Sequence, residues 1–178
     1  MAASTVTGLH FEEAALVRAA QGGDRAAFGA LYEQYARMVH GILLAHVSFG
    51  DAEDLLQDVF IRAMEKLHTL REPCAFGGWL AAVARRAATD AHRRNRPVED
   101  LQDWTVAARP DERAFQVLDA IRALPKAYRE TLMLRLVEGM TGPEIAARTG
   151  LTPESVRVNL CRGMKQLRQA LRGTKVDE

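Results

Sequence analysis

The sequence predicts an all-α protein made of two small helical domains joined by a short acidic linker. Apolar residues recur at helical spacing along most of the 178 residues, and no segment alternates as a half-buried strand does. The chain is 48% hydrophobic but only 6% aromatic, and it is rich in the helix formers Ala, Leu and Arg. Two prolines and a cluster of acids interrupt the pattern at 97–112. We therefore place the domains at 1–96 and 113–178, with the linker at 97–112.

Four helices are predicted in the N-terminal domain. The first covers 11–21 and ends at two glycines, and the second covers 25–47, with Asp24 as its cap. The apolar stripe of the second helix consists of Phe28, Leu31, Tyr35, Val39 and Ile42. Asp51 is expected to cap the third helix, 52–67, whose inward residues are Leu55, Val59, Ala63 and Leu67. Residues 71–78 are expected to form a loop, and the fourth helix covers 79–94.

The C-terminal domain is predicted to end in a helix-turn-helix motif. Helices at 114–124 and 126–139 precede it, separated by Pro125. Thr141 and Glu144 have the Thr-x-x-Glu spacing of a capping box, in which each side chain bonds the other residue's amide. Gly150 suits the left-handed conformation that ends a helix. The last helix runs from Pro153, where a missing N–H costs nothing, towards Arg172.

Charge is distributed very unevenly, although the formal net charge is only +1. Residues 1–60 hold eight acids and three arginines, whereas residues 85–96 hold five arginines and one acid. Residues 97–112 are acidic, and residues 157–175 hold six basic residues and no acid. Two basic segments are therefore candidates for phosphate contact. The N-terminal acids fit either a solvated surface or a surface that meets a basic protein.

Several classes of protein and site are disfavoured. No run of 18 apolar residues predicts a membrane span, and the first residues lack the basic start of a signal peptide. The cysteines, Cys74 and Cys161, form no CxxC motif or disulfide framework, so we expect a cytoplasmic protein. The five histidines are scattered, and we expect no metal site, no cofactor and no enzymatic activity.

The last helix presents a candidate DNA-reading surface. Its apolar stripe, expected to face inward, consists of Val156, Leu160, Met164, Leu167 and Leu171. An inward stripe of this kind turns Arg157, Val158, Cys161 and Arg162 outward. Arginine can donate two hydrogen bonds to guanine, and valine can contact a thymine methyl. Lys165, Arg168 and Arg172, further along the helix, suit backbone phosphates. A helix pair in a plain bundle is the alternative to a DNA-reading motif.

Four motifs, in order, resemble alternative sigma factors of the extracytoplasmic-function class, which guide bacterial RNA polymerase to promoters. "DRAAFGALYEQY" is similar to the family's opening helix, and "DAEDLLQDVFIRAMEKL" resembles its AED-hydrophobic-x-Q-[DE]-x-F segment. "WLAAVARRAATDAHRR" resembles its WL-x-x-x-AR-x-x-x-x-D-x-x-RR segment. The stretch from "ALPKAYRETL" to "LCRGMKQLR" is similar to its C-terminal DNA-binding domain almost end to end. The resemblance covers most of the chain.

The resemblance implies three sets of contacts. The clamp of the large polymerase subunit would be bound by Glu53, Asp54, Gln57 and Asp58. The −10 element would be contacted and opened by Trp79, Arg85, Arg86, Asp90, Arg93 and Arg94. The −35 element would be read by Thr152, Glu154, Ser155, Arg157, Val158, Cys161, Arg162 and Lys165.

Three of these assignments have local alternatives. The first-turn acids Glu53 and Asp54 are also favoured by the helix dipole alone, so Gln57 and Asp58 carry more of the functional interpretation. Trp79 fits core packing better than stacking on a base. Arg86 stands where the family often has Asn, which leaves the −10 base preference open.

The resemblance also implies core RNA polymerase, promoter DNA and an anti-sigma factor as partners. Three rival interpretations remain on the sequence alone. One is a repressor or activator that binds a palindrome as a dimer, without being a polymerase subunit. Another is an enzyme such as a nuclease with an acidic metal site. The third is an interaction protein that mimics a sigma factor.

Overall fold

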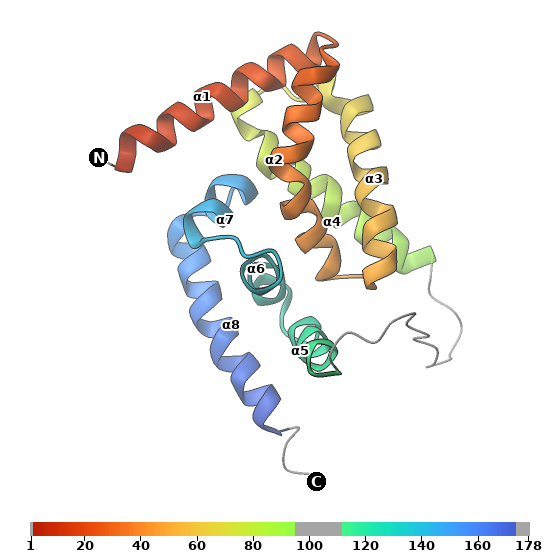
Figure 1. The fold of residues 1–178 in the computed structure, drawn as a ribbon, viewed down its shortest axis with the longest axis vertical. Helices are drawn as coiled ribbons and strands as arrows, with labels where there is room; N and C mark the ends of the chain where they lie inside the picture. The colour runs from red at the N-terminus through yellow and green to blue at the C-terminus, as the bar shows by residue number, and fades with distance from the viewer. Residues whose placement is uncertain (1, 95–111, 174–178) are drawn as a thin grey trace.

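The computed structural model describes the backbone of residues 2–94 and 112–173, and the side chains over most of these ranges. It confirms the all-α prediction, because the described residues form helices and connecting turns and contain no strand (Figure 1). The predicted linker, 97–112, lies outside the described residues except for Glu112, which begins a helix. None of the described helices is long and apolar enough to cross a membrane.

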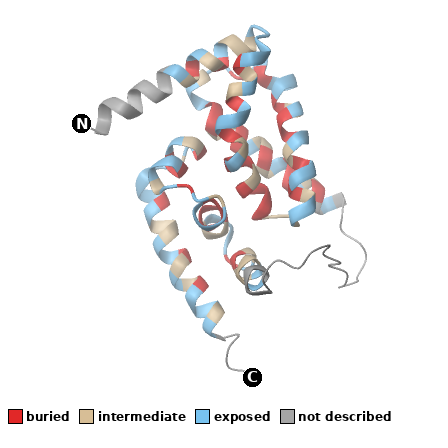
Figure 2. Cartoon of the chain, in the orientation of Figure 1, coloured by how far each residue is buried: buried red, intermediate tan, exposed pale blue. Residues whose placement is uncertain are grey.

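The N-terminal half contains α1 (Ala2–Gln21), α2 (Arg25–Leu44), α3 (Phe49–Lys66) and α4 (Phe76–Arg94), with short 3₁₀ turns at Leu67–Thr69 and Pro73–Ala75. Asp24 caps α2 as predicted, accepting hydrogen bonds from the amides of Ala26 and Ala27. All four inward residues predicted for α3 are buried, and so are the stripe residues of α2 apart from the half-buried Phe28. Figure 2 shows these buried positions along the facing sides of α2, α3 and α4.

Several local predictions in this half were wrong. α2 ends at Leu44 rather than at 47, and α3 starts at Phe49 rather than at 52. Only Asp51 therefore lies in the first turn of α3, and Glu53 and Asp54 lie beyond it. Ser48 rather than Asp51 caps α3: its hydroxyl accepts the amide of Asp51 at 3.2 Å and donates to the Asp51 carboxylate at 2.7 Å. Residues 71–78 are not a loop, because a 3₁₀ turn fills 73–75 and α4 starts at Phe76. Phe76 is fully buried with its ring edge against Tyr35, which holds this first turn in place. The first helix starts at Ala2, well before residue 11.

The C-terminal half contains α5 (Glu112–Arg122), α6 (Lys126–Leu136), α7 (Gly142–Thr149) and α8 (Pro153–Gly173). The predicted capping box is present, with both Thr141–Glu144 hydrogen bonds formed. Gly150 ends α7 with a φ of 74°, the left-handed conformation that glycine adopts without strain. The Thr152 hydroxyl accepts the Ser155 amide and so caps α8. The helix-turn-helix therefore forms where its local signals predict it.

The two halves pack against each other over a large shared surface. α6 and α7 lie on α2, α7 also contacts the start of α4, and the buried apolar residues of both halves form one continuous cluster (Figure 1). Gly41 of α2 permits this approach, because a methyl group there would lie 2.8 Å from Leu134 Cδ2 and 2.9 Å from Glu138 Cγ. α3 packs on α2 and α4 at the opposite edge of the molecule from α8.

Candidate nucleic-acid and protein interfaces

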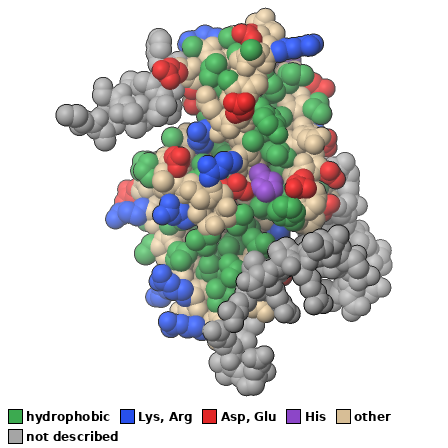
Figure 3. Space-filling view, viewed as in Figure 1, with side chains coloured by type: hydrophobic (Ala, Val, Ile, Leu, Met, Phe, Trp, Pro, Cys, Tyr) green, Lys and Arg blue, Asp and Glu red, His purple; other side chains and the backbone are tan. Residues whose placement is uncertain are grey.

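The four polymerase-contact candidates share the outer surface of α3. Glu53, Asp54, Gln57 and Asp58 are all exposed, while Leu55 and Val59 point into the core between them. The helix therefore has an apolar inner side and an acidic outer side, as the 3.6-residue period requires. Figure 3 shows acidic side chains along this edge of the molecule.

Two apolar residues that sequence reasoning missed lie on the same helix. Ile61 and Met64 are 54% and 55% exposed, which is unusual for side chains of this size on a half-buried helix. Ile61 lies three residues after Asp58, so the two side chains are neighbours on the helix surface. The sequence could have revealed these two residues, because both are apolar and both fall outside the inward stripe at Leu55, Val59 and Ala63.

The −10 candidates lie along α4, but only part of this set is open to solvent. Arg86 and Arg93 are exposed, Asp90 is half-buried, and the side chain of Arg94 lies outside the described residues. Trp79 is half-buried with its ring 5.9 Å from that of Phe76, so it packs at the edge of the core. Among the described side chains of α4, the basic candidates that are fully open to solvent are Arg86 and Arg93.

Arg85 is engaged by the other half of the molecule. Its Nε donates to Glu130 Oε2 of α6 at 2.8 Å, and the other oxygen of that carboxylate lies 2.9 Å from Nε2 of His46. The Glu130 side chain is only 10% exposed. Burial raises the pKa of Glu130, but the hydrogen bond from His46 and the charge of Arg85 outweigh this effect and hold the pKa below its usual value. Glu130 is thus a buried, ionised group shared between two partners of the N-terminal half.

Further polar contacts join the halves around the end of α2. Arg122 Nε donates to the Leu44 carbonyl at 3.1 Å, and Arg129 Nη1 donates to the Ala45 carbonyl at 3.4 Å. Helix C-terminal carbonyls lack intrahelical partners and carry partial negative charge, so two arginines stabilise them well. His40 Nδ1 lies 2.7 Å from Glu138 Oε1 on a neighbouring turn of the same interface.

A fourth arginine joins α7 to α2. The Arg148 guanidinium donates to the Gln34 carbonyl and lies over the Tyr35 ring, 5.2 Å from its centroid. The carbonyl of Arg148 faces Gly77 so closely that a methyl group at Gly77 would lie 2.3 Å from it. The interface therefore combines charged hydrogen bonds with glycines where backbones meet.

The predicted reading surface of α8 is largely open. Arg157, Cys161, Arg162 and Lys165 are exposed, as are Thr152, Glu154 and Ser155. Val158 is only half-exposed, which corrects the expectation that it faces fully outward. Of the inward stripe, Val156 and Leu167 are buried, and Leu160, Met164 and Leu171 are half-buried against the core. Figure 3 shows Lys and Arg side chains spread along the α8 edge.

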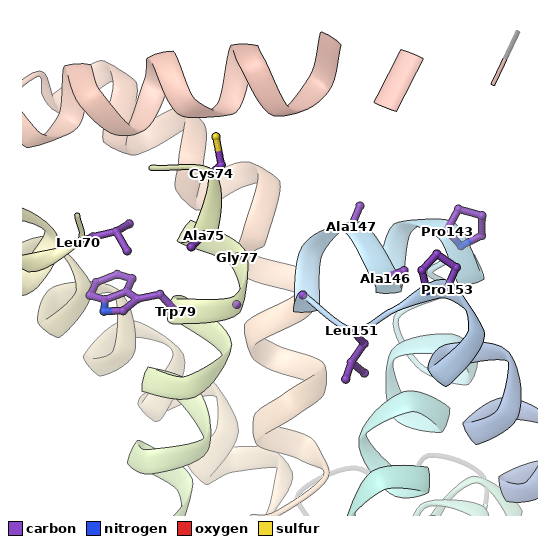
Figure 4. Close-up of a pocket in the computed structure, with 12 residues that line it drawn as sticks. Leu70, Cys74, Ala75, Gly77, Trp79, Pro143, Ala146, Ala147, Leu151 and Pro153 are labelled. Atoms are coloured by element: carbon purple, nitrogen blue, oxygen red, sulfur yellow. The ribbon is translucent and has the colours of Figure 1, made fainter. Parts of the chain in front are cut away.

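An apolar groove of about 800 Å³ separates the start of α4 from the helix-turn-helix. Figure 4 shows Leu70 and Trp79 on one side and Ala147, Leu151 and Pro153 on the other. Its walls come from both halves, so the groove exists only while the halves are packed together. Within the described part of the chain, no group of three or more His, Cys, Asp or Glu side chains gathers as a metal site would require.

Comparisons with known proteins agree with this geometry. A family model described as sigma-70 region 2 matches residues 31–98, and one described as sigma-70, region 4 matches residues 114–167. The RNA polymerase sigma factor CarQ of Myxococcus xanthus is 33% identical over 159 residues, which cover 84% of this chain and 91% of CarQ. Two further relatives are longer proteins, and the chain spans 42% and 64% of their lengths.

Two solved structures share the fold. CnrH, solved in complex with the cytosolic domain of CnrY, has a TM-score of 0.61 and 23% identity, covering 90% of this chain and 97% of CnrH. The sigma factor RpoE of Bartonella quintana, solved with the anti-sigma factor NepR, has a TM-score of 0.55 and 19% identity, covering 85% and 98%.

The chain belongs to the sigma-70 family of RNA polymerase sigma factors, which are transcription initiation factors. Within that family it is a member of the extracytoplasmic-function class, a description that several matched relatives also carry.

Proposed function

We propose that this chain binds the clamp of core RNA polymerase through the outer surface of α3 and carries the enzyme to promoters read by α4 and α8. The observation that carries the proposal is that acidic and basic side chains are exposed on different helices. Acidic Glu53, Asp54 and Asp58 lie on α3, whereas basic Arg157, Arg162 and Lys165 lie on α8. One surface suits a basic protein partner, and the other suits phosphate and base edges.

Ile61 and Met64 extend the proposed clamp-binding surface. Protein interfaces gain most of their affinity from a few apolar or aromatic anchors that become buried, with charges arranged around them. Two exposed apolar side chains, three and six residues after Asp58, supply such anchors on the outer side of the helix. The acids then give orientation and speed of association, and the apolar pair gives affinity.

The chain has no enzymatic activity of its own in this proposal, and it works in the cytoplasm, where the polymerase is. Promoter opening draws on binding energy: bases leave the stack and are held by protein groups, which offsets the cost of unpairing. We also propose an anti-sigma factor as the regulatory partner. Its support is the shared fold with RpoE, which is solved with such a factor.

Run-off transcription tests this proposal directly. Core polymerase should give specific transcripts from genomic DNA only when this chain is added, and mapped start sites should share upstream elements near −10 and −35. Absence of any specific transcript with active core polymerase would overturn it. Tight dimeric binding to a palindrome without polymerase would instead favour an ordinary helix-turn-helix regulator.

A further inference from the structure

We propose that Gln21, the last residue of α1, is a positioning residue for promoter opening: its side-chain amide holds the connection between α3 and α4 in the shape that sets the start of α4. The inference rests on the proposed function, since α4 carries the candidate −10 contacts. The sigma-70 region 2 model matches residues 31–98, so α1 lies outside it. None of the candidate DNA or polymerase contacts lies in α1 either.

A single side-chain amide bridges the two ends of the 3₁₀ turn that follows α3. Gln21 Nε2 donates to the Leu67 carbonyl at 3.0 Å and to the Leu70 carbonyl at 2.8 Å. The NH₂ group of glutamine has two donors, and both are used here. The two carbonyls lie just past the end of α3, where helical partners are missing. The amide therefore fixes the point at which the chain leaves α3 and turns towards α4.

α1 is held in place on α2 without help from Gln21. Val17 is fully buried and belongs to the continuous apolar cluster. The Glu13 carboxylate accepts a hydrogen bond from the Tyr35 hydroxyl, and the Tyr35 ring packs edge-on against Phe76, the first residue of α4. α1 therefore reaches both ends of the connection, the first through Gln21 and the second through Tyr35.

The connection carries side chains that lie beside the candidate −10 contacts. Leu70, whose carbonyl Gln21 holds, lines the apolar groove together with Trp79 of α4 (Figure 4). Arg71, the next residue, is exposed and offers a cation to backbone phosphate. Protein groups that hold a base out of its stack work best when they are already ordered, because ordering them during binding costs affinity. Gln21 supplies this order in advance, through the connection and without a DNA contact of its own.

Two substitutions remove the donors of Gln21 and keep the size of the side chain. Gln21→Met has a similar length and no N–H group, and Gln21→Glu is isosteric but presents carboxylate oxygens to the two carbonyls. Gln34→Met is the matched control, because Gln34 is an exposed residue of α2. The buried Val17 is unchanged in each variant, so α1 should stay docked. Circular dichroism checks that the helices are kept.

Amide hydrogen exchange in the free chain tests the contact by itself. The Leu70 amide donates to the Leu67 carbonyl at 3.1 Å, and this is one of the two carbonyls that Gln21 holds. Exchange at Leu70 should be on the order of tenfold faster in both Gln21 variants, because two hydrogen bonds no longer resist local opening. It should be unchanged in Gln34→Met. Equal exchange in all four chains would overturn the proposal.

Reconstituted transcription tests the positioning role. The templates are a promoter mapped by the run-off assay and the same promoter with its −10 element already unpaired by mismatched strands. With core polymerase, both Gln21 variants should lose activity on the duplex on the order of tenfold, the factor that about two net hydrogen bonds supply. On the unpaired template their activity should be close to that of the parent, and pull-down of core polymerase should be unchanged. The Gln34 control should match the parent in every assay.

The outcomes separate this inference from the proposed function. A merely structural defect would lower polymerase binding and reduce transcription equally on both templates, and that result would overturn the positioning role. So would Gln21 variants that transcribe the duplex as well as an active parent does. If the parent itself transcribes neither template, the proposed sigma function fails, and this inference fails with it.

Discussion

Arg157 and Lys165 share one exposed surface of α8 but differ in their distance from the helix start. Residues near the start of a recognition helix reach base edges, and those further along meet the backbone. Arg157 forms only a long contact of 3.8 Å with the fully solvated Glu154, which contributes little. The guanidinium is therefore free to turn towards a groove.

Arg157→Ala should weaken promoter affinity by about 1–3 kcal/mol if the side chain is bidentate to a guanine, and should relax preference at one base position. Lys165→Ala should weaken binding evenly across sequences and lower the salt slope by about one unit. Transcription from a panel of single-base −35 variants measures both effects. A base-specific change for Lys165 and none for Arg157 would show that another side of α8 reads the bases.

Asp58→Arg should weaken binding to core polymerase while leaving the fold intact. Asp58 is exposed on α3, past the first turn where the helix dipole alone favours acids, so the reversal costs little stability. Pull-down with core polymerase measures binding, and circular dichroism on the same sample measures folding. Glu33→Arg, an equal charge reversal on α2, should bind normally. If Asp58→Arg also bound normally, α3 would not be the polymerase surface.

At the scale of single elements, local sequence signals predicted the helix ends at which a cap residue or a glycine was recognised. The caps at Asp24, Thr141 and Gly150 were predictable because each depends on residues at most four positions away. The Thr141–Glu144 box is exposed, and hydrogen bonds from the Thr141 amide and hydroxyl hold the pKa of Glu144 below its usual value. A depressed carboxylate pKa stabilises the folded helix end at pH values above the ordinary value of 4.5.

The α7 cap should therefore weaken as pH falls through the depressed pKa of Glu144. The amide proton of Thr141, followed by NMR, should shift with a midpoint below 4.5. Glu144→Gln keeps an acceptor for the amide and removes the titration, so its Thr141 signal should stay flat. A midpoint at or above the ordinary value would mean that the box does not form in solution.

The cap at Ser48 was a local signal, three residues from Asp51, but other outcomes that the sequence did not predict depend on tertiary contacts. The start of α4 at Phe76 follows from the packing of its ring on Tyr35, more than 40 residues away, and no local signal at 71–78 reveals it. The pairing of Arg85 with Glu130 is likewise non-local. The charge pattern placed Arg85 in a basic segment, and the resemblance placed it among the −10 contacts, but neither showed which carboxylate it meets. The helices that carry the candidate residues were thus predictable, and the contacts of those residues were not.

At the scale of the whole molecule, the near-neutral net charge and the packing of the two halves both disfavour DNA binding by the free chain. The free chain should show no sequence-specific binding to duplex DNA carrying its promoter, because its basic surfaces are split and one is partly occupied. Addition of core polymerase should produce specific binding. Gel-shift assays with and without polymerase measure this. Tight, salt-resistant specific binding by the chain alone would contradict it.

The turn between α2 and α3 belongs both to the contact between the halves and to the start of α3. Ala45 accepts a hydrogen bond from Arg129, His46 bonds Glu130, and Ser48 caps α3. Two of these three contacts hold the turn against α6, and the third fixes the first turn of the helix that carries the candidate polymerase contacts. A substitution in this short turn would therefore disturb the contact between the halves and the start of α3 together.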